Sequence, residues 1–384
     1  MRKLKMGMIG GGKNAFIGSI HRIAANMDGL IELHCGAFSS NPETSKESGR
    51  DLFLPDSKCY GSYQEMITAE SKLPLGERMD FVSIVTPNFA HFAPAMMALE
   101  HGFHILIDKP MTLSLDEAKQ LQQKVYDTGL ILCLTHTYSG YPMVKQAKNM
   151  VAENKFGKIR KVMVEYPQGW LSTLTEKDGN KQAAWRTDPA KSGISGCMGD
   201  IGTHAAQLAE YISGLQITQL CADINTVVAG RQLDDDGNIL LKFNNGANGI
   251  LVASQIAAGE ENSLKIKIYG EVGGLEWHQM EPNTLVVKWP AAPAQIYRAG
   301  NNYLSESAQF NSRTPSGHPE GYLEAFANLY RNFALTLLAK IEGKQPTNEM
   351  LDFPTVEDGV RGMAFIENVI ASGNSDQKWF DFKI

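Results

Sequence analysis

An acid and an imidazole stand four positions apart in Gly199-Asp200-Ile201-Gly202-Thr203-His204. Residues i and i+4 share one face of an α-helix, so a helix over 199–213 would point Asp200 and His204 at the same substrate. A helix N-terminus disfavours the imidazolium, which would keep His204 neutral and able to accept a proton. The alternative is structural, with Asp200 as a helix cap and His204 as a satisfied helix histidine.

A third candidate is the lysine of Ile107-Asp108-Lys109-Pro110, which directly follows a strand of apolar residues. The commonest fate of a loop lysine is a solvated surface charge. Near the positive ring of a nicotinamide, however, its pKa would be lowered and it could hydrogen-bond a reacting oxygen. Pro110 fixes the direction of the backbone at this point.

The segment Gly10-Gly11-Gly12-Lys13-Asn14-Ala15-Phe16-Ile17-Gly18 lies between a predicted strand and a predicted helix. Glycines there let the backbone approach a pyrophosphate, whose charge the helix N–H groups then face. The spacing departs from GxGxxG, because about three extra residues separate Gly12 from Gly18. A tight strand-to-helix turn is the alternative. Together with Lys109, Asp200 and His204, the segment predicts a nicotinamide-dependent alcohol dehydrogenase.

The predicted cofactor contacts lie where strands end, because a doubly wound sheet binds ligands at the carboxyl ends of its strands. They are Gly10, Gly12, Ala15, Phe16, Ile17, Ser39, Ser40, Thr86, Pro87, Asn88, His91, Asp108, Lys109 and Pro110.

The end of the second strand leaves the choice between NAD and NADP open. Ser39 and Ser40 offer no acid for a ribose 2′-hydroxyl, although Glu43 could turn back toward it. Lys46 could meet a 2′-phosphate, but the chain has no arginine nearby until Arg50. This lack of a close arginine favours NAD mildly.

Three segments combine aromatic rings with polar groups, as sugar binding requires. The alternative is packing between domains, which explains the aromatic residues equally well. The predicted substrate contacts in these segments are His136, Tyr138, Tyr141, Gln168, Trp170, Trp185 and Arg186.

The elements that would position these residues divide the chain into two halves. In the first ~140 residues apolar strands alternate with amphipathic helices, which predicts a doubly wound parallel sheet. Later strand-like runs, separated by turns such as Asp234-Asp235-Asp236-Gly237, predict a mainly antiparallel open sheet. We expect a dinucleotide-binding domain at 1–139, a substrate and oligomerisation domain at 140–384, and a long loop at 290–319.

Composition excludes several classes of protein. The 384 residues have a net charge of −6, which argues against nucleic acid or a membrane surface as a partner. Their apolar runs are shorter than the ~20 residues that a bilayer requires, and the N-terminal segment does not resemble a signal peptide, so we expect a cytoplasmic protein. Five dispersed cysteines predict reduced thiols, and no spacing suggests a metal site.

On the glycine segment, Asp108-Lys109-Pro110 and Gly199–His204, the whole chain resembles the glucose–fructose oxidoreductase, inositol dehydrogenase and rhizopine-catabolism family. The resemblance implies a Rossmann domain, an α/β domain whose open sheet forms dimers or tetramers, and Lys109, Asp200 and His204 as the catalytic group. The family has Glu-Lys-Pro where this chain has Asp108-Lys109-Pro110. The segment Gly317–Tyr322 resembles a sugar-dehydrogenase branch, which adds His318 as a substrate contact.

The expected reaction is oxidation of a secondary alcohol of a sugar or cyclitol by NAD or NADP. Two alternatives belong to other classes. One is a glycoside hydrolase or lyase in which transient oxidation acidifies a neighbouring C–H bond. The other is a dinucleotide sensor without catalysis, against which the joint presence of Lys109, Asp200 and His204 argues.

Overall fold

The computed structural model describes residues 2–13 and 15–384, and the chain forms two compact units. Unit 1 comprises Met1–Thr137 and Tyr322–Val360, and unit 2 comprises Tyr138–Gly321 and Arg361–Ile384. Residues 322–360 therefore belong with the first unit, whereas the sequence analysis placed them in the second domain. Helix α11 (Tyr322–Ile341) explains the difference, because its apolar side packs against α1 (Phe16–Met27) in the core of unit 1.

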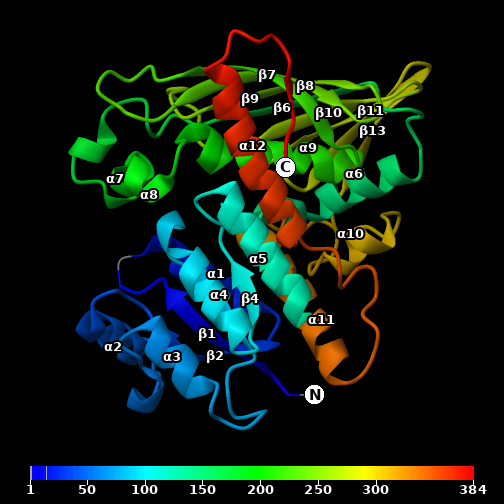
Figure 1. The fold of residues 1–384 in the computed structure, drawn as a ribbon. Helices are drawn as coiled ribbons and strands as arrows, with labels where there is room; N and C mark the ends of the chain where they lie inside the picture. Colours follow the sequence, from blue (N-terminus) through cyan, green and yellow to red (C-terminus); the bar gives the residue numbers. More distant parts are fainter. Residues whose placement is uncertain (1, 14) are drawn as a thin grey trace. The chain divides into compact units, whose positions relative to one another are not determined.

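Unit 1 is built on a five-stranded parallel sheet (Figure 1). The strand order β2-β1-β3-β4-β5 reverses direction beside β1, which confirms the predicted doubly wound fold. The carboxyl ends of all five strands lie at one edge of the sheet. The strands are β1 (Leu4–Gly10), β2 (Ile31–Ala37), β3 (Phe81–Val85), β4 (His104–Ile107) and β5 (Leu132–Leu134).

Helices cover both faces of this sheet. Alternate residues of β1 point to opposite sides, so each face offers side chains on which helices pack. Leu4, Met6 and Met8 pack with α1 and α11, whereas Gly7 faces Met66 of α3. Ser114 caps the start of α5, since its hydroxyl accepts the N–H of Glu117. Polar α2 and short α3 were not predicted. The further helices of unit 1 are α2 (Pro42–Asp51), α3 (Tyr63–Glu70), α4 (Phe92–Glu100) and α5 (Leu115–Thr128).

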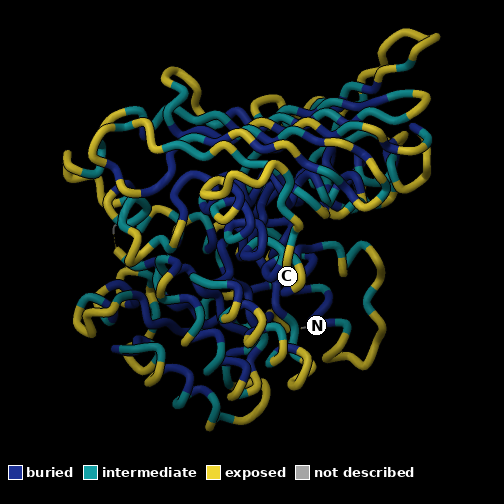
Figure 2. Tube along the Cα trace, turned by 45° about the horizontal axis from the view of Figure 1, so that its top comes forward, coloured by how far each residue is buried: buried dark blue, intermediate teal, exposed yellow. Residues whose placement is uncertain are grey.

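Unit 2 contains a nine-stranded sheet in the order β13-β12-β11-β10-β6-β9-β8-β7-β14. Only the β6–β9 pair is parallel among the described strand pairs, which agrees with the predicted mainly antiparallel sheet. Helices α6 (Pro142–Ala152) and α9 (Thr203–Ser213) cover one face. Buried and more exposed positions alternate along these strands, as expected for a sheet with one open face (Figure 2). The strands are β6 (Lys161–Pro167), β7 (Ile217–Asn225), β8 (Asp236–Phe243), β9 (Asn248–Ser254), β10 (Lys265–Tyr269), β11 (Gly274–His278), β12 (Thr284–Trp289), β13 (Ala292–Arg298) and β14 (Phe380–Asp381).

The predicted loop at 290–319 was wrong in part, because it contains β13 and α10 (Glu306–Phe310). Strand β13 pairs with β12 at the sheet edge, so tertiary pairing orders a segment whose composition suggested a loop. The remaining helices are α7 (Lys181–Arg186), α8 (Pro189–Ser192) and α12 (Val356–Gly373), the last of which crosses from unit 1 into unit 2. No helix within the described residues has the length and apolar character needed to cross a membrane.

A fully buried glutamate joins α3 to β2 and β3 in unit 1. Glu70 contacts the ammonium of Lys58 at 2.6 Å, the hydroxyl of Tyr60 at 2.9 Å and the imidazole of His34 at 3.4 Å. It also accepts the main-chain N–H of Met79 at 2.9 Å. Burial by itself would raise the pKa of Glu70, but these partners lower it to about 2.

We expect unit 1 to lose stability in acid because of Glu70. A carboxyl whose pKa is lower in the folded state stabilises the fold above its ordinary pKa, and this contribution disappears as the pH falls from about 4.5 toward 2. Replacing Glu70 by Gln should lower the free energy of unfolding at pH 7 by about 2–4 kcal/mol, because four donors lose their charged acceptor. Denaturant titrations at several pH values would measure this. The exposed Glu43→Gln is the control, and equal stability of the two variants would contradict the prediction.

Candidate active site

The glycine segment begins where β1 ends. Gly10 and Gly11 have φ of +82° and +70°, a backbone region that favours glycine. A Cβ on Gly18 would lie 2.3 Å from the carbonyl oxygen of Gly11, so α1 crosses the end of β1 in close contact. Gly11 and Gly18 therefore let helix and strand meet. Asn14 lies outside the described residues.

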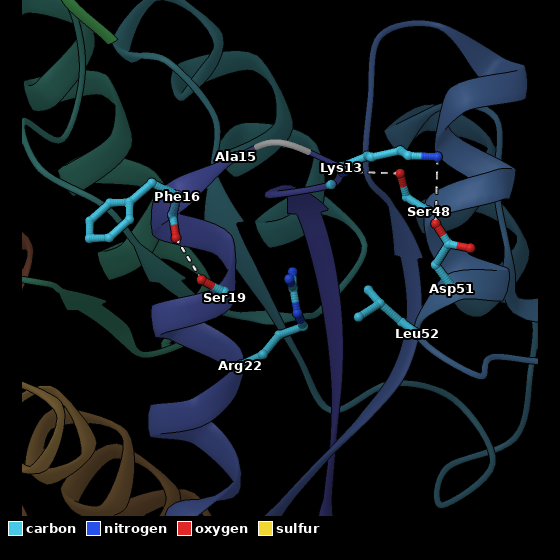
Figure 3. A pocket seen from close by; sticks show the side chains of 9 residues that line it. Lys13, Ala15, Phe16, Ser19, Arg22, Ser48, Asp51 and Leu52 are labelled. Carbon is cyan, nitrogen blue, oxygen red and sulfur yellow. Dashed lines mark hydrogen bonds and ion pairs between the residues drawn. The ribbon is translucent and has the colours of Figure 1, made fainter. Parts of the chain in front are cut away.

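Gly12 and Lys13 of the glycine segment reach the end of β2 and the side of α2 (Figure 3). The N–H of Gly12 donates to the carbonyl of Phe38 at 3.2 Å, and the N–H of Lys13 donates to the hydroxyl of Ser48 at 3.2 Å. A pocket of about 470 Å³ lies here between α1 and α2. Gly12, Ala15 and Phe16 were predicted to hold a cofactor, whereas Ser19 and Arg22 of α1 and the lining residues of α2 were not. The lining residues are Gly12, Lys13, Ala15, Phe16, Ser19, Arg22, Ser48, Asp51 and Leu52.

As predicted, the cofactor candidates include residues just after strands, namely Ser39 after β2 and Thr86 and Asn88 after β3. His91 was predicted to contact the cofactor as well, but its side chain lies in the interior. His91 is completely buried, and its two ring nitrogens lie 2.8 Å from the carbonyl oxygens of Thr86 and Pro110. Burial lowers its pKa. As placed, His91 ties together the loops after β3 and β4 and does not face a ligand surface.

Lys109 and His136 follow the neighbouring strands β4 and β5. The side chain of Asp108 accepts the main-chain N–H of Lys109 at 2.9 Å and the hydroxyl of Thr135 at 2.8 Å. His136 is 2% exposed. Burial and the nearby charge of Lys109 lower the pKa of His136 to about 3, so its imidazole is neutral at physiological pH.

Asp200 and His204 belong to unit 2, where Asp200 lies in a π-helical turn and His204 lies in the α-helix that follows it. Residues Met198–Gly202 form a π-helical turn and α9 begins at Thr203, whereas the sequence predicted a continuous helix over 199–213. The carboxylate of Asp200 accepts the side-chain N–H of Gln255 at 2.9 Å and lies 3.5 Å from the guanidinium of Arg186.

A buried aspartate holds the backbone that leads to Asp200. The side chain of Asp234 accepts the N–H groups of Gly196 and Met198, both at 2.7 Å, and its carbonyl accepts the N–H of Cys197 at 2.8 Å. Burial raises the pKa of Asp234, while the two N–H groups lower it. The sequence predicts only a turn at Asp234–Gly237. The contact spans 36–38 positions, so no local pattern could reveal it.

Hydrogen-bonded aromatic residues surround His204. The ring of Tyr138 meets the imidazole edge-to-face at 4.9 Å between centroids, and the hydroxyls of Tyr138 and Tyr166 bond to each other. Asn262, which the sequence analysis missed, accepts from Tyr166 at 2.6 Å and donates to Tyr138 at 3.1 Å. This network supplies rings and polar groups beside the candidate base.

Gln168 and Trp170 extend the network, and Arg186 approaches it from α7. Gln168 donates to Asn262 at 2.7 Å and accepts the indole N–H of Trp170 at 3.0 Å. The guanidinium of Arg186 stacks over Trp185 at 4.2 Å from the ring centroid and lies 6.0 Å from that of Trp170. Of the predicted substrate residues in unit 2, the structure thus brings together Tyr138, Gln168, Trp170, Trp185 and Arg186.

Two predicted substrate residues have different surroundings. Tyr141 is 2% exposed and packs between Tyr138 and Trp277, so it supports the aromatic cluster from the core. His318 lies on an exposed turn, where its N–H donates to Pro315 and its carbonyl accepts from Thr314. Within the described residues, no three His, Cys, Asp or Glu side chains are arranged to hold a metal ion, and the five cysteines are free.

Comparisons with known proteins agree with the two-part architecture. A family model described as the oxidoreductase family with an NAD-binding Rossmann fold matches residues 4–136, and one described as the GFO/IDH/MocA C-terminal domain matches residues 144–276. The uncharacterized oxidoreductase YfiI of Bacillus subtilis is 32% identical, over 100% of this chain and 98% of the relative.

Two further relatives have named ligands or substrates. An inositol dehydrogenase homolog from Azotobacter vinelandii complexed with NAD+ has a TM-score of 0.94 and 32% identity, over 99% of this chain and 98% of that one. Its complex with NADH and myo-inositol has a TM-score of 0.91, 31% identity and the same coverage. Levoglucosan dehydrogenase from Pseudarthrobacter phenanthrenivorans is 26% identical, over 77% of this chain and 78% of the relative.

The close contact of Gly11 with Gly18 leads to a prediction about dinucleotide binding. Gly18→Ala places a methyl group 2.3 Å from the Gly11 carbonyl, so α1 must move away from the end of β1. We expect the Kd for NAD to rise at least about tenfold, since the helix N–H groups no longer face the pyrophosphate. Fluorescence titration would measure the Kd. Asn26→Ala, at an exposed position of the same helix, is the control, and an unchanged Kd in Gly18→Ala would refute the prediction.

Proposed function

Because this chain belongs to the GFO/IDH/MocA family of oxidoreductases, we propose that it reversibly oxidises a secondary alcohol of a sugar, sugar derivative or cyclitol with NAD or NADP. The observation that carries this proposal is the group around His204 in unit 2. It combines a candidate base, a carboxylate and hydrogen-bonded aromatic side chains, which suit the apolar faces and hydroxyls of a polyol ring.

The glycine segment fits a dinucleotide. Gly10 and Gly11 adopt positive φ and Gly18 leaves no room for a Cβ, so a pyrophosphate could approach the backbone between β1 and α1 closely. Ser39 and Thr86 would line the same edge of the sheet. When bound, the nicotinamide supplies the hydride acceptor.

The residues of this chain would divide the remaining chemistry. His204 takes the proton of the substrate hydroxyl, and Asp200 fixes the polar surroundings of His204 through its contacts with Gln255 and Arg186. Lys109 donates a hydrogen bond to the substrate oxygen. Trp170 and Trp185 offer flat apolar faces, and Gln168 offers an amide.

The surroundings of Asp200 favour a neutral substrate. Arg186 is engaged with the Asp200 carboxylate and the Trp185 ring, so its charge is already balanced. Two of the similar proteins, the homolog complexed with myo-inositol and levoglucosan dehydrogenase, have an uncharged ring as ligand or substrate. A panel of neutral polyols and sugars, together with acidic and phosphorylated ones, assayed at 340 nm with each cofactor tests the class. Turnover of a glycoside without net NADH formation would point instead to the redox-assisted hydrolase or lyase.

Replacement of the proposed base is the direct test of mechanism. His204→Ala should lower turnover by roughly 10²–10⁴-fold, the range for loss of a general base. The Kd for cofactor should change little, because His204 belongs to the group around Tyr138 and Asn262. Steady-state kinetics and cofactor titration measure the two quantities. Near-normal turnover on the true substrate would remove His204 from the mechanism.

Variants of Asp200 and Lys109 separate the roles of these two residues from that of His204. Asp200→Asn keeps an acceptor for Gln255, so its effect on turnover should be milder than that of His204→Ala. Lys109→Ala should impair both turnover and cofactor placement. The buried, supporting Tyr141→Phe is the control and should retain most activity.

We also propose a mild preference for NAD over NADP, and the structure offers a physical reason. The glycine segment delivers Lys13 to α2, but its ammonium lies 3.1 Å from Glu47 and 4.0 Å from Asp51. Gly12 is bonded to Phe38 at the end of β2, where the adenosine ribose binds in this fold. A 2′-phosphate there would meet two carboxylates and one lysine already paired with them.

The double variant Glu47→Gln with Asp51→Asn should therefore bind NADP about two- to fivefold better relative to NAD, since exposed charge pairs contribute modestly. Titration of both cofactors at fixed ionic strength gives the ratio. Adding Lys13→Ala to this variant should remove the gain. NADP bound more than a hundredfold tighter than NAD by the unchanged protein would overturn the preference.

We propose, finally, that the protein is a homodimer or homotetramer through the open face of the unit 2 sheet. Leu240, Ile250 and Met163 stand side by side across β8, β9 and β6, and two of them are more than one-third exposed. Such an apolar row on a sheet face is typical of an interface between copies. Leu240→Glu should shift the mass measured by light scattering toward the monomer. Exposed Leu75→Glu in unit 1 is the control, and a monomeric unchanged protein would contradict the proposal.

A further inference from the structure

The carboxylate that precedes Lys109 has two differently occupied oxygen atoms. Its Oδ1 accepts the main-chain N–H of Lys109 at 2.9 Å and the hydroxyl of Thr135 at 2.8 Å, so it ties the Lys109 turn to the end of β5. The N–H of Asp108 donates to the carbonyl of Ile84 in β3 at 3.0 Å. The direction in which Lys109 leaves the sheet therefore depends on how the Asp108 carboxyl group is rotated.

The other oxygen of Asp108 faces a completely buried histidine of α1. His21 Nε2 lies 3.8 Å from Asp108 Oδ2, and His21 Nδ1 lies 2.7 Å from the hydroxyl of Tyr330 in α11. The Tyr330 hydroxyl lies 2.8 Å from that of Ser83 in β3. Phe326 packs against the His21 ring at 4.6 Å between centroids. A series of polar contacts thus runs through the apolar core of unit 1, from β3 through α11 and α1 to the turn after β4.

The chemistry of these groups orders the protons in this series of contacts. A carboxylate only accepts hydrogen bonds, so the ring proton of a neutral His21 belongs on Nε2, the nitrogen that faces Asp108. Nδ1 then accepts from Tyr330, and Ser83 donates to the Tyr330 oxygen. In this arrangement the hydroxyls of Ser83 and Tyr330 each donate one hydrogen bond. The series of contacts ends at the Asp108 carboxylate, which accepts the main-chain N–H of Lys109.

We propose that His21 is a positioning residue for Lys109, acting by fixing the rotation of the Asp108 carboxyl group. The proposal rests on the role of Lys109 given above. His21 would not touch substrate or cofactor, because its side chain is completely buried. Tyr330 and Ser83 fix His21 in turn, which makes α11 part of the support for the site.

The charge balance of Asp108 gives this proposal a measurable signature. Burial alone would raise the pKa of Asp108, but His21, Lys109 and Thr135 lower it below its ordinary value. Without His21, fewer interactions oppose the rise that burial causes in the pKa of Asp108. The Asp108 carboxylate therefore takes up a proton at a higher pH. The Lys109 turn would then loosen as the pH falls. The titratable groups that face or influence Asp108 are His21 on α1, Tyr330 on α11, His91 before α4, Lys109 after β4 and His136 after β5.

His21→Leu and Phe326→Leu form a matched pair of variants. Both disturb the same packing contact, but only the first removes the group that faces Asp108. For His21→Leu we expect kcat to fall roughly tenfold from misplacement of Lys109, with the Kd for NAD within about threefold of the unchanged protein. The acid limb of the kcat/KM profile should move to higher pH in His21→Leu and stay in place in Phe326→Leu. His21→Gln, which retains an N–H donor, should restore part of kcat.

A measurement that does not require activity separates this proposal from the proposed reaction. Amide hydrogen exchange in the peptide covering residues 108–113 should be faster in His21→Leu than in Phe326→Leu. Tyr330→Phe, which keeps the ring and loses only the hydroxyl, should give a smaller increase and serves if His21→Leu does not fold. Equal exchange and equal acid limbs in the matched pair would overturn the role of His21. Faster exchange in a protein that dehydrogenates no polyol would leave the positioning role intact and reject the proposed reaction.

Discussion

Two carboxylates that accept main-chain N–H groups, one partly buried and one buried, hold the two segments on which the proposed chemistry depends. Asp108 accepts the N–H of Lys109, and Asp234 accepts those of Gly196 and Met198 just before Asp200. A charged acceptor forms stronger hydrogen bonds than a neutral one, and a buried carboxylate is costly unless such donors surround it. Each aspartate therefore has one favourable position, and the turn bonded to it is fixed with it.

The two units support these turns in different ways. In unit 1 the turn ends a parallel strand, and its polar support comes from helices packed against the sheet face, through His21 and Tyr330. In unit 2 the turn starts a helix, and its support comes from the sheet through Asp234 and Gln255. In both units, a short polar segment is thus held by side chains from rigid elements of the same unit.

Aromatic residues near His204 combine packing with hydrogen bonding. Tyr138 and Tyr166 are almost completely buried, yet their hydroxyls are satisfied by each other and by Asn262. Burial of satisfied hydroxyls rigidifies a site, whereas an unsatisfied one would destabilise it. The polar edge of this network extends to Gln168 and Trp170, which are less buried.

Local patterns in the sequence predicted much of the architecture. Apolar strands and the glycine segment after the first of them depend on neighbouring residues, so the doubly wound parallel sheet could be recognised. The candidates Lys109, Asp200 and His204 were identified from residue type and spacing. Helix α2 was missed because its residues are mostly polar, and β13 because a strand at a sheet edge is defined by its partner.

Tertiary structure alone decided what surrounds those candidates. His21 meets Tyr330 across 309 positions, Asn262 meets Tyr138 across 124, and the Gly11–Gly18 contact exists only because α1 crosses the end of β1. It also placed α11 in unit 1, buried His91 and Tyr141, and left His318 on an exposed turn. The sequence by itself determined which residues can do chemistry, because that depends on residue type. Their partners depend on which distant segments pack together, and no local spacing contains that information.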